Sequence, residues 1–276
     1  MADNARQPID DYLPQPGTDL YYAHRYAPRA LQPALALIEA LRGEIARVPA
    51  SCSSPEIAAT KLAWWREEIA RLDAGVPRHV LCIALNARRI TLPGLTAAAA
   101  ALVDGISALL DLSRHPTRAA RSAAFDAAHG PLWALVNGLS VPLDDAAAHA
   151  AAQLGCRVEE ACALRDTRRF VASGAALLAQ DSVQLIETQL AGSALDDAQW
   201  YARVIGHDLA QVSSALRSGL ATLPGRRRLR PLATLARIAL VTLEEVQADG
   251  NRVWVQRVEL TPLRKLWLAL RERAGL

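Results

Sequence analysis

PALALIEALRGEIARVPAS, residues 33–51, is the first long stretch in which apolar residues recur at the spacing of a helix. Its apolar residues are mostly Leu and Ala, which are among the strongest helix formers. The same pattern recurs in blocks along the rest of the chain, whereas runs of β-branched residues are few. Residues 252–260, RVWVQRVEL, are the best candidate for a strand. The sequence therefore predicts an all-α protein.

Helix ends are marked by Pro and Gly, as in VPASCSSPE (48–56) and DAGVP (73–77). We predict helices over about 19–26, 29–48, 55–74, 79–88, 94–112, 117–129, 131–138, 143–172, 197–221, 230–249 and 259–274. No repeat of fixed period and no low-complexity linker divides the chain. We expect a loosely ordered tail over 1–18 and a single helical domain over 19–276.

Charge and composition exclude several classes of protein. With 31 basic and 28 acidic residues, the net charge of +3 is too balanced to indicate nucleic-acid binding. The dense basic cluster GRRRLRP (225–231) is interpreted as a solvated loop, or as a contact for an anionic membrane surface or a diphosphate. The four cysteines have no CxxC spacing, and no apolar stretch is long enough to span a membrane. We expect a cytoplasmic protein, with peripheral contact to the inner face of a membrane as an alternative.

Common catalytic signatures are absent from the sequence. There is no GxGxxG, Walker-type phosphate loop, GxSxG or HExxH. No two histidines are four residues apart, and only Glu245 and Asp249 form a carboxylate pair at helical i, i+4 spacing. That pair precedes Gly250 at a predicted helix end, so we interpret it as a solvated last turn. We predict no metal site and no catalytic residue.

Three segments together resemble the squalene/phytoene synthase family. They are DLYYAHRYAPRALQPALALIEALRGEIARV (19–48), KLAWWREEIARLDAGVPRHVLCIAL (61–85) and LGCRVEEACALRDTRRFVASGAALLAQDSV (154–183). The residues that match the family patterns of the first two segments are Tyr21, Ala23, Arg25, Pro28, Lys61, Leu62, Trp64, Trp65, Arg66, Gly75 and His79. The resemblance implies an isoprenoid-synthase-like helical fold around a central apolar cavity, lined mainly by Leu, Ala, Val and Trp. It also implies two Asp-rich motifs that hold magnesium on a prenyl diphosphate.

The chain departs from the family pattern where those carboxylates are expected. Ala46 and Ala50 stand at the first motif, with Arg47 between them. In the second motif Asp166 is retained, whereas Arg169 and Phe170 replace the later acids. A family Asn becomes Cys162, and the Gly-Arg-x-Tyr-Leu-Pro segment becomes residues 174–179, GAALLA. The helix bearing Ala46 is expected to face Asp166 across the mouth of the cavity.

These departures from the family pattern suggest a ligand site without metal. Arginines can bind phosphates directly, so a diphosphate or lipid headgroup could be held by the arginines of the two altered motifs, which are Arg47, Arg165, Arg168 and Arg169. Alternatively, these arginines are exposed and pair with Glu159 or Glu160. Of the adjacent tryptophans Trp64 and Trp65, we expect one to pack in the core. The other either packs in the core as well, or lines the cavity, or contacts a membrane surface. The candidate ligand-binding residues are Tyr22, Arg25, Arg47, Trp65, Arg165, Asp166, Arg168 and Arg169.

Two classes of function remain open on the sequence. The first is a catalytically degenerate family member that binds an isoprenoid or lipid, or assists a partner protein or complex. It resembles the family branch that lacks Asp motifs and includes a mitochondrial respiratory complex I assembly factor. The second is an active head-to-head prenyl transferase that needs magnesium and makes a squalene- or phytoene-type product. The shortage of carboxylates favours the first, for which no cofactor is expected.

Overall fold

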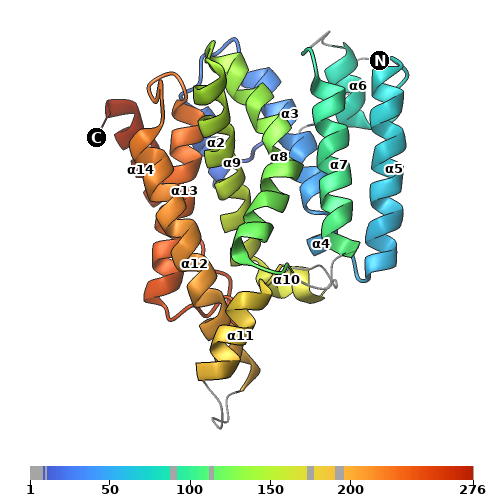
Figure 1. Ribbon diagram of the computed structural model, residues 1–276. Helices are drawn as coiled ribbons and strands as arrows, with labels where there is room; N and C mark the ends of the chain where they lie inside the picture. The colour runs from blue at the N-terminus through green and yellow to red at the C-terminus, as the bar shows by residue number, and fades with distance from the viewer. Residues whose placement is uncertain are drawn as a thin grey trace.

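The computed structural model describes residues 9, 11–87, 92–111, 115–172, 177–189 and 196–275, and these are almost entirely helical (Figure 1). The helices named here are α2 (Asp19–His24), α3 (Gln32–Ala46), α4 (Val48–Ser51), α5 (Pro55–Asp73), α6 (Val80–Ala87), α7 (Leu95–Asp111), α8 (Arg118–Ser140), α9 (Asp145–Arg165), α10 (Thr167–Ala172), α11 (Gln180–Gln189), α12 (Asp197–Thr222), α13 (Arg230–Ala248) and α14 (Pro262–Ala274). No named strand occurs in this part of the chain. The prediction of an all-α fold is confirmed.

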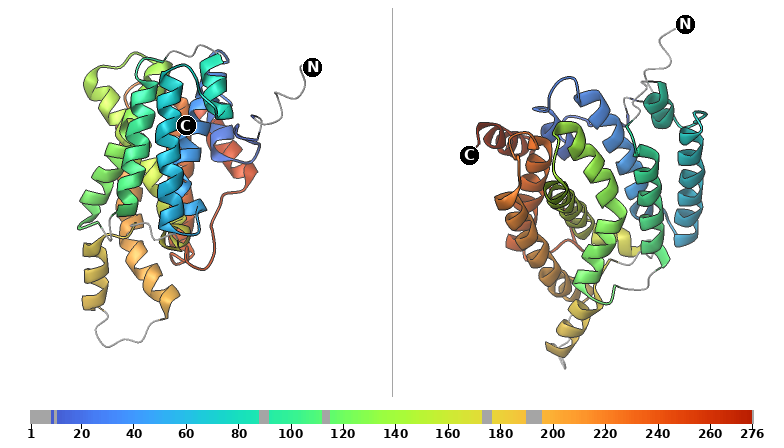
Figure 2. Two further views of the ribbon diagram at one scale, coloured as in Figure 1. Left: turned by 90° about the vertical axis from the view of Figure 1, so that its right-hand side faces the viewer. Right: turned by 45° about the horizontal axis from the view of Figure 1, so that its top comes forward.

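Helix α9 runs through the middle of the bundle, surrounded by the other long helices (Figure 2). It packs against α8, α12 and α13, and α8 packs in turn against α7. The helices α5, α6 and α7 form one side of the molecule, and α12, α13 and α14 form the other (Figure 1). The short helices α4 and α10 contact each other at one end of the bundle. This arrangement places the residues around 46 and 166 near each other.

Sequence features explain why the central helices lie so close. An added Cβ at Gly155 of α9 would come within 2.3 Å of the Trp133 ring of α8, and one at Gly105 of α7 would come within 2.4 Å of Ala128. Only glycine permits these approaches, and the side chains of Trp133 and Phe125 are almost completely buried. Side-chain hydroxyls or carboxylates cap several helix starts, including Ser54, Thr117, Asp144 and Asp196.

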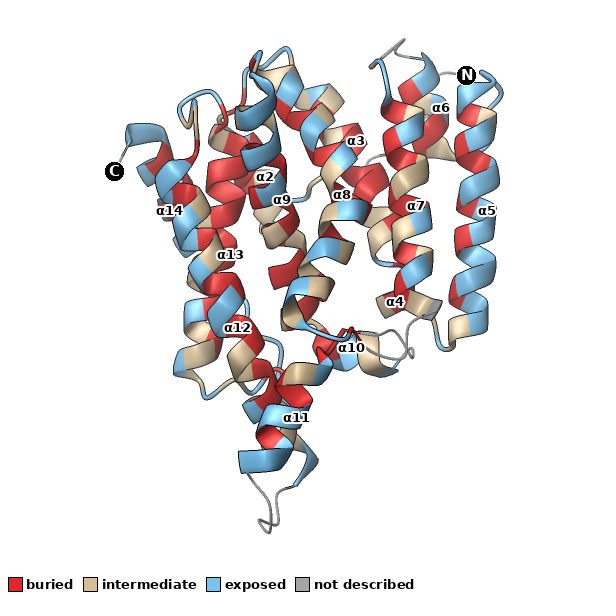
Figure 3. Ribbon diagram, in the orientation of Figure 1, coloured by how far each residue is buried: buried red, intermediate tan, exposed pale blue. Residues whose placement is uncertain are grey.

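Burial follows the position of each helix in the bundle (Figure 3). On α13 and on the part of α9 from Ala151 onward most residues are buried, whereas the outer face of α5 is exposed. One large apolar cluster extends from α3 to α13, and a smaller one joins Tyr22 to Ile238 and to Leu268 of α14. Within the described residues, no helix is both long enough and apolar enough to cross a membrane.

Several predicted boundaries were wrong. The helices predicted over 117–129 and 131–138 are one helix, α8, which continues through Pro131. The helix predicted over 143–172 is broken at Asp166 into α9 and α10, and α11 was not predicted at all. Residues 252–260 form turns and irregular structure rather than a strand. Residues 1–8 and 10 of the predicted tail, and residues 174–176 of the altered family segment, lie outside the described residues.

Candidate functional site: a cavity with a charged mouth

A cavity of about 670 Å³ lies between the helices, with walls from α3, α7, α8, α9 and α13. Its apolar wall includes Ile106, Leu109, Phe125, Leu235 and Leu243. The lining includes the two phenylalanines Phe125 and Phe170, but no tryptophan is among the lining residues that the structure describes. The cavity therefore offers space for an apolar chain, but the expectation of a tryptophan-lined wall was wrong.

His129 is a polar exception in the apolar wall. Its ring stacks on Phe125 with centroids 5.6 Å apart, and its Nδ1 is buried without a hydrogen-bond partner among the described residues. Burial, and then the nearby positive charge of Arg42, lowers the pKa of His129 to about 3. The imidazole is therefore neutral at pH 7 and adds no charge to the cavity wall.

Arg42 of α3 carries the innermost positive charge of the cavity. Its guanidinium forms ion pairs with Glu39 and with Glu159 of α9, and it lies 5.2 Å from the ring centre of Trp133. Burial lowers the pKa of Arg42, but Glu159 and Glu39 raise it by more, so Arg42 stays charged. Because both carboxylates are occupied by this one cation, neither is free to face the cavity alone.

A second set of ion pairs surrounds Asp166 at the mouth of the cavity. Arg257 Nε lies 2.9 Å from Asp166 Oδ1, and Arg165 Nη2 lies 3.6 Å from Asp166 Oδ2. Lys265 Nζ forms an ion pair with Asp19 Oδ1 at 2.7 Å, and Arg165 Nη1 lies 3.7 Å from Asp19 Oδ2. Each of these carboxylates therefore has at least one cationic partner within 4 Å.

Cationic side chains outnumber carboxylates on the cavity lining. The lining contains six cationic side chains and four carboxylates. The cations are Arg42, Arg47, Arg165, Arg169, Arg257 and Lys265, and the carboxylates are Asp19, Glu159, Asp166 and Glu259. Arg169 has no ion pair with a described residue, so its positive charge is available to a ligand. The mouth is thus better suited to an anionic group than to a cation.

The two regions that correspond to the family's acidic motifs do meet across the cavity. Ala46 and Ala50 line it from α3 and α4, and Asp166 and Phe170 line it from the break between α9 and α10. Among the described residues, no group of three or more His, Cys, Asp or Glu side chains could hold a metal ion. Glu245 and Asp249 lie elsewhere, beside Arg264 and Arg252 respectively.

The structure divides the predicted ligand residues into two groups. Arg47, Arg165, Asp166 and Arg169 line the cavity. The other four do not line it. Tyr22 is buried against α13 and α14, and Arg25 faces a separate groove. Trp65 packs against Trp64 and His79, and Arg168 donates a hydrogen bond to the carbonyl of Trp254. Trp64 is 40% exposed, so only one tryptophan of the pair lies in the core.

The predicted partners of the arginines were also wrong. Arg47 pairs with Glu44 of its own helix, and Arg165 pairs with Asp19 and Asp166 rather than with Glu159 or Glu160. Arg42, Arg257 and Lys265 were missed as site residues. Arg42 could have been found from its i+3 spacing to Glu39 on the helical face that ends at Ala46, but nothing near Arg257 or Lys265 in the sequence indicates the cavity.

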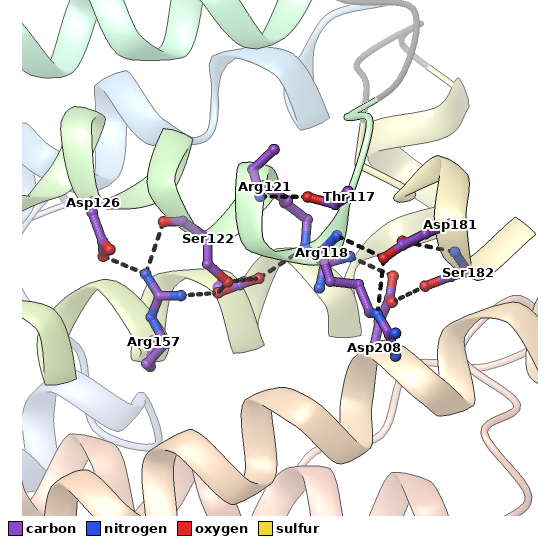
Figure 4. Close-up of polar contacts among 11 residues, drawn as sticks. Thr117, Arg118, Arg121, Ser122, Asp126, Arg157, Asp181, Ser182 and Asp208 are labelled. Atoms are coloured by element: carbon purple, nitrogen blue, oxygen red, sulfur yellow. Dashed lines mark hydrogen bonds and ion pairs between the residues drawn. The ribbon is translucent and has the colours of Figure 1, made fainter.

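Glu160, the next residue of α9 after Glu159, belongs to a different ion cluster. It accepts from Arg121 Nε at 2.8 Å and from Ser122, and it pairs with Arg157. Arg121 also forms an ion pair with Asp208, whose other oxygen accepts from Ser182 at 2.5 Å (Figure 4). The charged side chains of Arg121, Glu160 and Asp208 are completely buried. This cluster ties α8, α9, α11 and α12 together and lies outside the cavity lining.

Comparison with known proteins identifies a family and similar folds. A family model described as squalene/phytoene synthase matches residues 13–264. The fold is similar to squalene synthase HpnC from Alicyclobacillus acidocaldarius, with 16% identity, TM-score 0.61, and coverage of 84% of this chain and 88% of that one. It is also similar to a dehydrosqualene synthase in complex with ligand, with 15% identity, TM-score 0.73, and coverage of 93% and 91%. No curated protein sequence matches the chain.

Proposed function

The chain belongs to the squalene/phytoene synthase family, and from that premise we propose that it is a catalytically degenerate member that binds its ligand without transforming it. The ligand is an isoprenoid or other lipid, with an apolar chain that fills the cavity and an anionic head that meets the arginines at its mouth. Binding uses no magnesium. The bound protein acts alone or assists a partner protein.

The observation that supports this proposal is the pairing of carboxylates with cations at the mouth. A divalent cation of the magnesium type requires about six oxygen ligands, several of them carboxylates or phosphates. Asp166 faces Arg257 and Arg165, and the positions of the lost acids carry Ala46, Ala50 and Phe170. The residues present therefore do not fit a magnesium cluster, and the positive charge that the described lining offers to a diphosphate comes from its arginines and Lys265.

Ligand affinity would come from two parts of the cavity. Burial of an apolar chain against Leu235, Leu243 and Phe125 contributes about 25 cal/mol per Å² of apolar surface removed from water. Arg169, and Arg165 by exchange of its partners, would bind the phosphate oxygens in the paired geometry that guanidinium groups favour.

A product assay tests the proposal directly. The purified protein is incubated with labelled farnesyl or geranylgeranyl diphosphate and magnesium, and the extract is analysed by chromatography. We expect no squalene- or phytoene-like product above a heat-killed control, because loss of one electrostatic donor typically costs ~10²–10³ in rate and several are missing here. Product formed by the wild-type protein would refute the proposal.

Restoring the acids gives a gain-of-function version of the same assay. The variant combines Ala46→Asp, Ala50→Asp and Phe170→Asp, all on the cavity lining. Product from this variant, and none from the wild type, would show that the fold supports the chemistry when the carboxylates are supplied. A variant with Ala→Asn, Ala→Asn and Phe→Asn at the same positions controls for polarity without charge.

An active prenyl transferase is the second candidate, because four carboxylates do line the cavity: Asp19, Glu159, Asp166 and Glu259. If a diphosphate displaced them from their cationic partners, they could turn toward a metal. Calorimetric titration with farnesyl diphosphate distinguishes the two candidates. Degenerate binding predicts the same affinity with and without magnesium, whereas tight binding that requires magnesium would favour the transferase.

We also propose that a cytoplasmic protein of this kind meets the inner face of a membrane through α14. Leu263, Trp267 and Leu270 recur at helical spacing on this helix and are 78%, 59% and 39% exposed. Arg264 and Arg271 flank them, as is typical of helices that lie on anionic lipid surfaces. Trp267→Ser should weaken co-sedimentation with anionic vesicles, whereas the equally exposed but isolated Val76→Ser should not.

A further inference from the structure

A second concave site lies outside the cavity, at the start of α3 and α13 and the end of α14. It is an open groove of about 820 Å³ and shares no lining residue with the cavity. Four arginines line it: Arg25, Arg29, Arg230 and Arg273. No Asp or Glu is among the described residues of its lining. Four cationic side chains from three parts of the sequence therefore converge on one concave surface without compensating acids.

These arginines are free to bind a ligand. Arg25 Nη1 donates to the hydroxyl of Tyr21 at 3.1 Å, and Arg273 stacks over the ring of Tyr26 at 5.1 Å. None of the four forms an ion pair with a described residue, in contrast to nearby Arg226, which pairs with Glu272 at 2.6 Å. Their charge is therefore not neutralised by the protein.

Two helix N-termini add to the positive potential of the groove. Gln32 and Arg230 are the first residues of α3 and α13, and both line it. Neither helix has a side-chain cap or an acidic residue in its first turn. The dipole of such helix starts favours phosphate and other anions.

A buried polar group in the groove lacks a partner. His24 lines the groove, its residue is 7% exposed, and its Nδ1 has no hydrogen-bond partner among the described residues. A buried polar atom without a partner is costly unless a ligand or water satisfies it. His24 thus points to a polar ligand on grounds that are independent of the arginines and the helix starts.

We propose that this groove binds a phosphate or diphosphate group, at a site separate from the cavity. Guanidinium groups bind two phosphate oxygens at once, and several of them arranged around a concave surface suit a group with many anionic oxygens. The source of the phosphate is either a soluble molecule or the headgroup of a lipid. This assignment does not depend on the function proposed for the cavity.

Titration calorimetry with inorganic pyrophosphate, without divalent metal, tests the site. Arg29→Gln is the key variant, because Arg29 is exposed and forms no hydrogen bond or ion pair with a described residue, so the change should not disturb folding. We expect Arg29→Gln to weaken binding about tenfold, and the double variant with Arg25→Gln to weaken it further, since a hydrogen bond to a charged group is worth about this factor.

Two control variants separate the groove from other surfaces. Arg203→Gln removes the same charge from an exposed position on α12 and should leave pyrophosphate binding unchanged. Arg169→Gln removes a charge from the cavity mouth and should affect only binding there. Pyrophosphate binding that is equal in the wild type and in the Arg25→Gln/Arg29→Gln variant would overturn the proposal, and so would no binding by the wild type.

Vesicle binding then distinguishes the two sources of phosphate. The probes are phosphatidylcholine vesicles with and without phosphatidic acid, which presents a phosphate monoester. Groove-dependent binding to the phosphatidic acid vesicles would support a lipid headgroup, whereas groove-dependent binding of pyrophosphate alone would support a soluble phosphate. Vesicle binding lost in Trp267→Ser but retained in Arg29→Gln would assign the membrane contact to α14 and exclude a headgroup from the groove.

Discussion

Glu159 and Glu160 are neighbours on α9, and they belong to two very different ion clusters. Glu160 lies in a closed cluster with Arg121 and Arg157, whereas Glu159 joins Arg42 on the cavity lining. The first cluster is sealed between four helices, and its central charges are completely buried. The second borders the cavity, as does the set of ion pairs around Asp166, in which the side chain of Arg257 is 41% exposed.

The difference separates a structural ion cluster from one that can bind. In the closed cluster the charges have only each other, because water and ligands have no access, and rearrangement would leave a charge unpaired. At the cavity mouth a ligand phosphate can replace a carboxylate beside Arg165, and the released carboxylate can be solvated. The same residue types at consecutive positions of one helix therefore serve different purposes because they face different surroundings.

The largest expected effect is on the closed cluster. Among the described residues, Arg121 is the cation that pairs with both Glu160 and Asp208; in Arg121→Met, Glu160 keeps its ion pair with Arg157, but Asp208 is left buried without one. We expect the free energy of unfolding to fall by roughly 3–5 kcal/mol, the usual result of removing one partner from a buried ion pair. Urea denaturation followed by circular dichroism measures this change.

Arg66→Met is the matched control for Arg121→Met. Arg66 pairs with Asp104 at 2.5 Å, but the two side chains are 53% and 63% exposed, so the loss should be about 0–1 kcal/mol. Equal losses in the two variants would show that burial does not distinguish the clusters.

A smaller effect is expected from the neutral imidazole between the clusters. The folded protein holds the pKa of His129 near 3, whereas the unfolded chain has the ordinary value of 6.5. As the pH falls from 6.5 toward 3, His129 binds a proton in the unfolded state but stays neutral in the folded state. The free energy of unfolding therefore decreases over that pH range. Relative to His129→Gln, the wild type should lose about 2 kcal/mol between about pH 8 and about pH 5.

The comparison of wild type with His129→Gln isolates this group, because all carboxylates titrate in both proteins. Denaturation curves at several pH values provide the measurement. Parallel pH profiles for the two proteins would mean that water reaches the imidazole and that the cavity wall around Phe125 is not dry.

The smallest change in stability is expected at the cavity mouth. Arg257→Gln removes one cation from Asp166, but Arg165 remains 3.6 Å from the same carboxylate and solvent is close. The free energy of unfolding should change by less than about 1 kcal/mol. A loss as large as that of Arg121→Met would show that the mouth is a closed structural cluster, and its role in binding an anion would be untenable.

The sequence predicted the helices because their signals are local. Apolar spacing in residues 33–51 and caps such as Ser54 act over a few residues, so the type of each long element could be inferred. The helix break at Asp166 was missed because the sequence around it, ACALRDTRRF, has helical character throughout. Pro131 was interpreted as a boundary, yet it lies within α8, where tertiary packing outweighs the local preference.

Four of the eight predicted ligand residues do line the cavity, and these were found from the family resemblance rather than from local signals. Arg47, Arg165, Asp166 and Arg169 were found because the family resemblance aligned two segments that face each other. Arg257 and Lys265 could not be found, because they reach the cavity from the irregular segment and helix that follow α13. Their contacts with Asp166 and Asp19 join residues far apart in the sequence, and no local pattern encodes such pairs.

Lys265 has a further consequence, which concerns the synthesis of the protein. Its Nζ donates to the carbonyl of Gly17 at 2.9 Å and also lies 2.7 Å from Asp19, so the cavity mouth is joined by residues from opposite ends of the chain. On the ribosome, α2 emerges first and must wait for α14 before this contact can form. Until then Ile238 of α13 also lacks its apolar contact with Leu268 of α14. The growing chain therefore leaves this face of α13 uncovered during translation, and the mouth of the cavity is completed only after α14 has been made.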